Sequence, residues 1–85
     1  MYEIVILPQA MEDLSRLDKG TARRIFGRLD WLAENIEDVT PLPLRGSLSG
    51  FYKLRAGDWR IIYEVEHAGK VIFVHRIGHR REIYR

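Results

Sequence analysis

The sequence predicts an α+β fold in the order βααβββ, with two N-terminal helices packed on a mostly antiparallel, twisted sheet. Two observations carry this prediction. Apolar residues recur at spacings of three and four over positions 22–36, which is the periodicity of a helix with one buried face. Three runs rich in β-branched and aromatic residues, at 51–55, 59–66 and 71–77, follow and are separated only by short glycine-containing turns.

Length and composition bound the class of protein. The chain has 85 residues, of which 46% are hydrophobic, so we expect one domain over residues 1–85 with a modest core. It has no cysteine, which excludes a disulfide framework and thiolate metal sites and fits a reducing compartment. The apolar run at 4–7 is too short for a signal peptide or a membrane span. We therefore expect a soluble, cytoplasmic protein.

The first half of the chain predicts one strand and two helices. Residues 2–7 form a short run rich in β-branched side chains that ends at Pro8, which predicts a strand. Pro8 also suits the first turn of a helix, which we expect Gly20 to end. Thr21 can cap the second helix, whose charged face is expected to be solvated or, alternatively, to bind a partner. Residues 37–50 are broken by prolines and glycines and predict a loop, which its leucines should hold across the sheet edge.

The three C-terminal strands predict two hairpins, whose register sets the two faces of the sheet. If Ala56-Gly57 is the first turn, Lys53 lies opposite Arg60. If Ala68-Gly69 is the second turn, Ile62 lies opposite His75, and Arg60 lies opposite Ile77. The face expected to pack on the helices carries Tyr52, Leu54, Trp59, Ile61, Tyr63, Val65, Ile72 and Val74. The other face carries Phe51, Lys53, Arg55, Arg60, Ile62, Phe73 and His75.

Charge is distributed unevenly along the chain. Residues 1–44 have a net charge of −3 and residues 45–85 a net charge of +5, so the second half is the anion-facing half. Its aromatic residues suit nucleic acid, although most of them are expected to be ordinary core. Like charges directly opposite in a sheet are destabilising. Lys53 opposite Arg60 therefore favours an anion bound between the two, and Arg80 can join them.

The chain closes with Ile77-Gly-His-Arg-Arg-Glu-Ile-Tyr-Arg85, which is rich in groups that donate to phosphate. Terminal segments fray unless they are anchored. Ile77 and Ile83 can reach an apolar surface and leave Arg80 and Tyr84 to face a ligand. A solvated basic tail is the alternative interpretation.

The hairpin and the tail together resemble the RelE/ParE family of toxins from type II toxin–antitoxin systems, over nearly the whole chain. The matching segments are Leu44-Arg-Gly-Ser-Leu-Ser-Gly50, Tyr52-Lys-Leu-Arg-Ala-Gly-Asp-Trp-Arg-Ile-Ile-Tyr63 and Gly78-His-Arg-Arg-Glu-Ile-Tyr84. The last two are specific in combination. The resemblance implies a RelE-like (microbial RNase-like) toxin fold and a tight complex with a cognate antitoxin.

Two branches of this family differ in activity. RelE-like members cleave mRNA in the ribosomal A site, using residues that match Lys53, Arg60, Arg80 and Tyr84. ParE-like members inhibit DNA gyrase without catalysis. Phe51 stands where the best-known RelE pattern has a second lysine, and the chain ends without the further C-terminal helix of some members. The RelE branch is our expectation and the ParE branch the alternative.

The RelE branch implies RNA cleavage by attack of a 2′-OH on the adjacent phosphorus, which needs a base, an acid and cations. Arg60 is the candidate for charge stabilisation, because a guanidinium stays protonated and grips phosphate as a fork. Arg80 is a second clamp that can support the leaving group. Lys53 and Tyr84 remain alternatives for the base, and Tyr84 is otherwise a platform on which a base can stack. Further RNA contacts are expected from Arg45, Arg55, His79, Arg81 and Arg85.

No metal and no cofactor are expected, because the three histidines lack metal-ligand spacing and carboxylates are few on the working face. His75 is expected to be a packed strand histidine. The expected partners are mRNA and rRNA at the A site and an antitoxin, which would also carry the complex to operator DNA. A concave basic face with exposed Phe51, Ile62 and Phe73 is costly to leave open. We expect an antitoxin segment, disordered when free, to cover it or to displace the tail.

Overall fold

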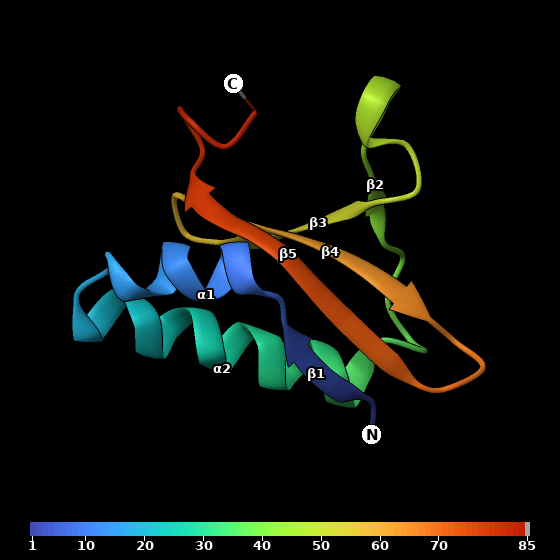
Figure 1. The fold of residues 1–85 in the computed structure, drawn as a ribbon. Helices are drawn as coiled ribbons and strands as arrows, with labels where there is room; N and C mark the ends of the chain where they lie inside the picture. The colour runs from blue at the N-terminus through green and yellow to red at the C-terminus, as the bar shows by residue number, and fades with distance from the viewer. Residues whose placement is uncertain (85) are drawn as a thin grey trace.

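Two helices lie on one face of a five-stranded sheet in the computed structural model, which describes residues 1–84 (Figure 1). The elements in chain order are β1 (Glu3–Ile6), α1 (Pro8–Ser15), α2 (Lys19–Asn35), β2 (Leu42–Pro43), the 3-10 turn η1 (Gly46–Leu48), β3 (Tyr52–Ala56), β4 (Trp59–Glu66) and β5 (Val71–His79). The strand order is β1-β5-β4-β3-β2, with only β1 and β5 parallel. The predicted α+β class and mostly antiparallel sheet are confirmed. The segment that follows β5, residues 80–84, is called the tail. The tail and η1 lie on the side of the sheet away from the helices, here called the outer face (Figure 1).

The boundary between the two helices differs from the prediction. The first helix ends at Ser15, and Gly20 lies inside the first turn of α2. Asp18, and not Thr21, caps α2: its Oδ1 accepts a hydrogen bond from the Thr21 backbone N–H at 2.7 Å. A carboxylate accepts a hydrogen bond from a free backbone N–H and is also stabilised by the positive end of the helix. Asp18, three positions before the threonine, therefore fixes the start of α2. The Thr21 amide accordingly lowers the pKa of Asp18.

The loop predicted for residues 37–50 does lie across the sheet edge, and part of it forms a strand that the prediction lacked. Leu42 pairs with Lys53 and Pro43 with Tyr52. The Leu44 N–H then donates to the Phe51 carbonyl at 3.0 Å. Proline is tolerated here because an edge strand leaves one row of N–H positions unpaired. The chain then rises into η1.

The register of the first hairpin was predicted wrongly, by two residues. Gly57 and Asp58 form the turn, so Arg55 faces Arg60 and Lys53 faces Ile62. Gly57 has a φ of 63°, a value that favours glycine in a two-residue turn. Because side chains alternate with a period of two, a two-residue shift leaves every residue on its predicted face.

The register of the second hairpin agrees with the prediction near the turn and differs from it further along the strands. An irregularity between Ile62 and Tyr63 shifts the register by one residue, so Ile62 faces Arg76 and not His75. Arg60 consequently faces Gly78 and not Ile77. Such a bulge re-aims side chains locally, which a regular alternation cannot anticipate.

The core lies between the helices and the sheet, as the predicted apolar face requires. Leu54, Ile61, Tyr63, Ile72 and Val74 are all buried there. The remaining members of the core are Tyr2, Ala10, Leu14, Ile25, Leu29, Leu32, Ala33, Ile36, Ala56 and Ile77.

Two apolar residues do not lie where they were expected. Phe26, part of the helical stripe, is 45% exposed. Ile62, expected to be open on the outer face, is 3% exposed. Ile62 is buried because η1 and the tail cover that face of the sheet. The alternation of side chains along a strand does not predict this burial, since it depends on tertiary packing. No helix within residues 1–84 has the length and apolar character needed to span a bilayer.

Candidate functional site

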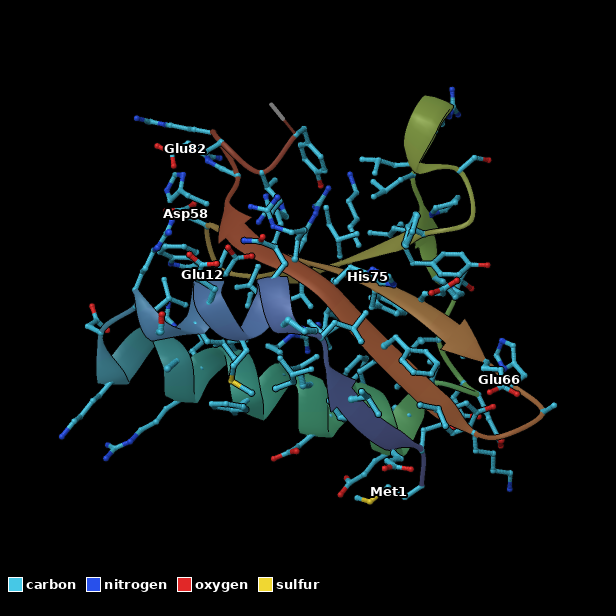
Figure 2. The ribbon with its side chains drawn as sticks, viewed as in Figure 1. Met1, Glu12, Asp58, Glu66, His75 and Glu82 are labelled. Carbon is cyan, nitrogen blue, oxygen red and sulfur yellow. The ribbon has the colours of Figure 1, made fainter. Side chains whose placement is uncertain are left out.

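The tail is folded back on the sheet and held at several points. Its backbone forms a turn in which the N–H groups of Glu82 and Ile83 donate to the His79 carbonyl at 2.9 and 3.0 Å. The Arg80 N–H donates to the Asp58 carbonyl at 2.8 Å, which joins the tail to the β3–β4 turn. Figure 2 shows Asp58 and Glu82 at this end of the molecule. Ile83 is 8% exposed. The predicted anchoring by Ile77 and Ile83 is therefore confirmed, while Arg80, Arg81 and Tyr84 keep their side chains exposed.

Two adjoining hollows lie between the tail and η1 on the outer face of the sheet. The first, here called the aromatic hollow, has a volume of about 520 Å³ and is lined by Gln9, Leu48, Phe51, Ile62, His75, Arg76, Ile83 and Tyr84. The second, the basic hollow, has a volume of about 580 Å³ and is lined by Pro43, Leu44, Arg45, Gly46, Leu48, Lys53 and Tyr84. Leu48 and Tyr84 line both, so the two hollows share a wall. Tyr84 is 46% exposed at that wall.

The basic hollow brings together Lys53 and Tyr84, which lie far apart in the sequence. Lys53 projects from β3, whose edge is paired with β2. Arg45, in the segment between β2 and η1, adds a second cation to the same hollow. An anion placed here would meet two cationic groups and a phenol.

Arg60 and Arg80 instead contact the β3–β4 turn and line neither hollow. One guanidinium nitrogen of Arg60 donates to the carbonyls of Gly57 at 2.8 Å and Trp59 at 2.9 Å. Arg80 Nε lies 3.7 Å from a carboxylate oxygen of Asp58. Arg60 is nevertheless a diagonal neighbour of Lys53 across the β3–β4 pair, at the roughly 7–8 Å spacing of such neighbours. Lys53 and Tyr84 thus share the basic hollow, whereas the guanidinium groups of Arg60 and Arg80 lie at the β3–β4 turn.

The other predicted RNA contacts are dispersed. Arg55 faces Arg60 across the hairpin, and its carbonyl accepts a hydrogen bond from Arg28 Nε at 2.9 Å. The His79 ring packs edge-on against Trp59, with centroids 5.6 Å apart, and its Nδ1 accepts from the Arg81 N–H at 3.2 Å. Arg81 itself is exposed in the tail turn. Arg45 lies in the basic hollow, and Arg85 lies outside the described residues.

A third hollow, of about 260 Å³, lies on the other side of the tail and holds His79 with Asp13 and Trp59. Asp13 is 8% exposed and was not singled out by the sequence. Its Oδ2 accepts hydrogen bonds from the Ile77 N–H at 2.9 Å and from Arg76 Nε at 3.0 Å. Burial acts to raise the pKa of Asp13, but these two hydrogen bonds and the Arg76 charge outweigh it, so the pKa lies below 3.8. Asp13 thereby provides a hydrogen-bond acceptor for the backbone N–H of Ile77, in the part of β5 that β1 does not reach.

Sequence reasoning also missed that Phe51, Ile62 and His75 share one cavity. Phe51 and His75 pack edge to face with ring centroids 4.7 Å apart. His75 Nε2 lies 2.9 Å from Glu64 Oε1, which agrees with the prediction of a packed strand histidine. The available signal was the shared outer face, but closure of the cavity depends on η1 and the tail. Within residues 1–84 no cluster of three or more His, Cys, Asp or Glu side chains is placed to hold a metal ion.

The fold and site define a small α+β protein with helices on one face of the sheet and a cation-lined hollow on the other. The family model described as the ParE toxin of type II toxin–antitoxin systems, parDE, matches residues 4–84. Toxin RelE of Mycobacterium tuberculosis is 30% identical over 88 residues, covering 99% of this chain and 87% of that protein. Toxin RelG of the same organism is 35% identical over 43 residues, about half of each chain (51% and 49%). The chain therefore belongs to the RelE/ParE family of toxins of type II toxin–antitoxin systems.

Solved structures agree with this assignment. The RelE–RelB complex of Pyrococcus horikoshii contains a chain with a TM-score of 0.70 and 31% identity, covering 95% of this chain and 97% of that one. The RelBE2 toxin–antitoxin complex of M. tuberculosis contains a chain with a TM-score of 0.82 at 23% identity, covering 92% and 96%. The second likeness shows the common fold.

Proposed function

We propose that this protein is a toxin that cleaves mRNA in the ribosomal A site and so blocks translation. The observation that carries the proposal is the basic hollow, which Lys53 and Tyr84 both line and which lies next to the strand pair that carries Arg60. The similarity to toxin RelE of M. tuberculosis over 99% of the chain supports the RelE branch. The A site would supply mRNA together with rRNA phosphates for the exposed arginines, in the cytoplasm.

In the proposed reaction a ribose 2′-oxygen attacks the adjacent phosphorus. The 2′-O–P bond forms as the P–O5′ bond breaks, which leaves a 2′,3′-cyclic phosphate and a free 5′-hydroxyl. A base takes the 2′-OH proton, and an acid returns a proton to the 5′-oxygen. Lys53 and Tyr84 both line the hollow and remain the two candidates for the base.

The arginines supply the charge that the pentacoordinate phosphorus needs. Arg60 now donates to two backbone carbonyls of the β3–β4 turn, and a phosphate would replace these neutral acceptors with a stronger, charged one. Arg80 would release Asp58 in the same way and support the leaving oxygen. A donor aimed at developing charge contributes about 10²–10³ in rate.

The test is to induce the wild type, Arg60→Ala and Arg80→Ala in cells and to map the ends of cut RNA. Each variant should lose growth inhibition and mRNA cleavage and keep its circular dichroism spectrum. Arg23→Ala is the matched control, because Arg23 is an exposed arginine on α2, away from the outer face. Toxicity retained by a folded Arg60→Ala/Arg80→Ala double variant would overturn the mechanism.

The family model that matches residues 4–84 is that of ParE, which favours a second candidate function, the non-catalytic inhibition of DNA gyrase. The two functions give different responses on induction. Translation arrest with cut mRNA supports the endoribonuclease, and filamentation with DNA damage supports the gyrase inhibitor.

We also propose a cognate antitoxin as the partner, as in the RelE–RelB complex of P. horikoshii. An antitoxin segment that is disordered when free would cover the outer face or displace the tail, and the complex would bind operator DNA through the antitoxin. Ile62 is already buried, so the apolar surface left for the segment comes from Phe51, Phe73 and Tyr84.

A further inference from the structure

Apart from Tyr84, no residue that lines the aromatic hollow takes part in the proposed cleavage. The side chains of this hollow are nevertheless held by specific contacts. Its floor is Ile62, which is 3% exposed. The rings of Phe51 and His75 pack edge to face with centroids 4.7 Å apart. Nε2 of the His75 imidazole lies 2.9 Å from Glu64 Oε1. His75 lies on β5 on the outer side of the sheet (Figure 2). These contacts fix the rings before any ligand arrives.

The chemistry of the lining suits a flat ring with polar edges. Phe51, which directly precedes β3, and Tyr84, in the tail, offer aromatic rings to the hollow. Gln9 and Arg76 also line the hollow. Each donates one N–H to Asp13 and has further N–H groups that can donate to the edge of a base. Nucleobases unstacked from a single strand are recognised in this way, by stacking on aromatic rings and by hydrogen bonds to their edges.

The neighbouring basic hollow supplies the second half of the argument. Tyr84 and Leu48 form the wall between the two hollows. A ligand that crosses this wall would place a planar group on the aromatic side and an anion beside Arg45 and Lys53. A nucleotide within a single strand has this division between base and phosphate, and the net charge of +5 over residues 45–85 favours it over an apolar peptide.

We propose that the aromatic hollow binds one unstacked nucleobase of single-stranded RNA whose phosphate lies in the basic hollow, and that stacking on Phe51 gives a modest preference among the bases. The proposal rests on the proposed function for the identity of the RNA. It assigns a role to Phe51, His75 and Gln9, none of which takes part in the proposed cleavage.

The experiment uses a trinucleotide with 2′-O-methyl groups, which cannot be cut, carrying 2-aminopurine at its centre. Stacking quenches the emission of 2-aminopurine, so titration of the protein reports binding in the hollow directly. Phe51→Leu should weaken the quenched complex roughly tenfold, because the base loses the ring on which it stacks. Phe51→Tyr keeps a ring and should retain the quench. Phe73→Leu is the matched control, since Phe73 lies on the same outer side of β5 and lines neither hollow.

Cellular cleavage maps complete the test. Phe51→Leu should change the distribution of bases next to the cuts while cleavage continues. Wild type that shows no quench, or a quench unaffected by Phe51→Leu, overturns the proposal. A Phe51→Leu change that weakens only the antitoxin complex assigns the hollow to the protein partner and also overturns it. A Phe51-dependent quench in a protein that cuts no mRNA would leave the nucleotide site standing and would sink the cleavage proposal alone.

Discussion

The side chain of Ile83 lies against the bare backbone of Gly78: a Cβ at position 78 would come within 2.8 Å of Ile83 Cδ1. Gly78 also faces Arg60 across the β4–β5 pair. The missing side chain therefore lets the tail fold down onto β5, which places Tyr84 at the wall between the two hollows.

Gly78→Ala is expected to lift the tail. The added methyl overpacks the contact with Ile83, at a cost of about 1–3 kcal/mol in the free energy of unfolding. Displacement of Tyr84 should lower RNA cleavage by roughly tenfold to a hundredfold, because misplacement by about 1 Å has effects of that size. Limited proteolysis of the tail and cleavage rates measure the two effects. Gly27→Ala is the control, since a Cβ there meets nothing within 4 Å; wild-type cleavage by Gly78→Ala would contradict this role for the tail.

Asp58→Asn is expected to free Arg80 without loss of stability. The ion pair is long, at 3.7 Å, and its side chains are 52% and 66% exposed, so it contributes at most about 0.5 kcal/mol. The backbone hydrogen bond from Arg80 to residue 58 does not depend on the carboxylate. RNA should bind a few-fold more tightly at low salt because a competing anion is gone. Weaker binding by Asp58→Asn would show that the carboxylate instead positions Arg80 for the phosphate.

Asp13→Ala should destabilise the fold at neutral pH. The change leaves the buried Ile77 N–H without its acceptor, at a cost of about 1–3 kcal/mol. Because the folded-state pKa of Asp13 is lowered, its contribution is present above the unfolded pKa, near 4, and is lost as pH falls through the folded value. Urea denaturation of Asp13→Ala and wild type between pH 2 and 7 should show a gap that narrows on acidification. A gap that stays constant with pH would contradict the ionic contribution.

Ionisation of the buried Tyr63 is expected to lower the free energy of unfolding at alkaline pH. Burial, with a smaller effect of Tyr52, raises the pKa of Tyr63 from 10.0 to about 12. A raised pKa means that the contribution is complete below pH 10 and is lost as pH rises from 10 to 12, on the order of 2–3 kcal/mol in all. Tyr63→Phe keeps the packing and removes this titration, so its stability should fall less steeply over that range. Parallel curves for the two proteins in thermal melts from pH 8 to 12 would rule the effect out.

Association with a cognate antitoxin should depend on salt through Arg80. Exposed charges are screened over about 10 Å at 0.1 M salt, and charge steering acts mainly on the association rate. Arg80→Ala should slow association at low salt and flatten its dependence on ionic strength in stopped-flow measurements. A steep dependence left unchanged by the mutation would place the antitoxin on the acidic first half of the chain.

The sequence by itself determined most of the residues that face inward, with Phe26 and Ile62 as exceptions. The α2 stripe and the alternation in β4 are local periodicities, so Leu29 and Ile61 could be assigned to the core without knowledge of the pairing. The same periodicity protected the assignment of Lys53 and Arg60 to the outer face when the register moved by two residues. Turn glycines and prolines likewise marked the ends of the strands, because the backbone angles they favour are local properties.

Only the tertiary structure decided what those faces meet. The parallel pairing of β1 with β5, the acceptor that Asp13 provides for Ile77 and the burial of Ile62 all join segments distant in sequence. Their positions are set by packing free energy among competing arrangements, which a local pattern does not encode. The site divides along the same line. Lys53 and Tyr84 could be named from the sequence, but their meeting in one hollow, and the turn of Arg60 and Arg80 toward residues 57–59, depend on how η1 and the tail fold over the sheet.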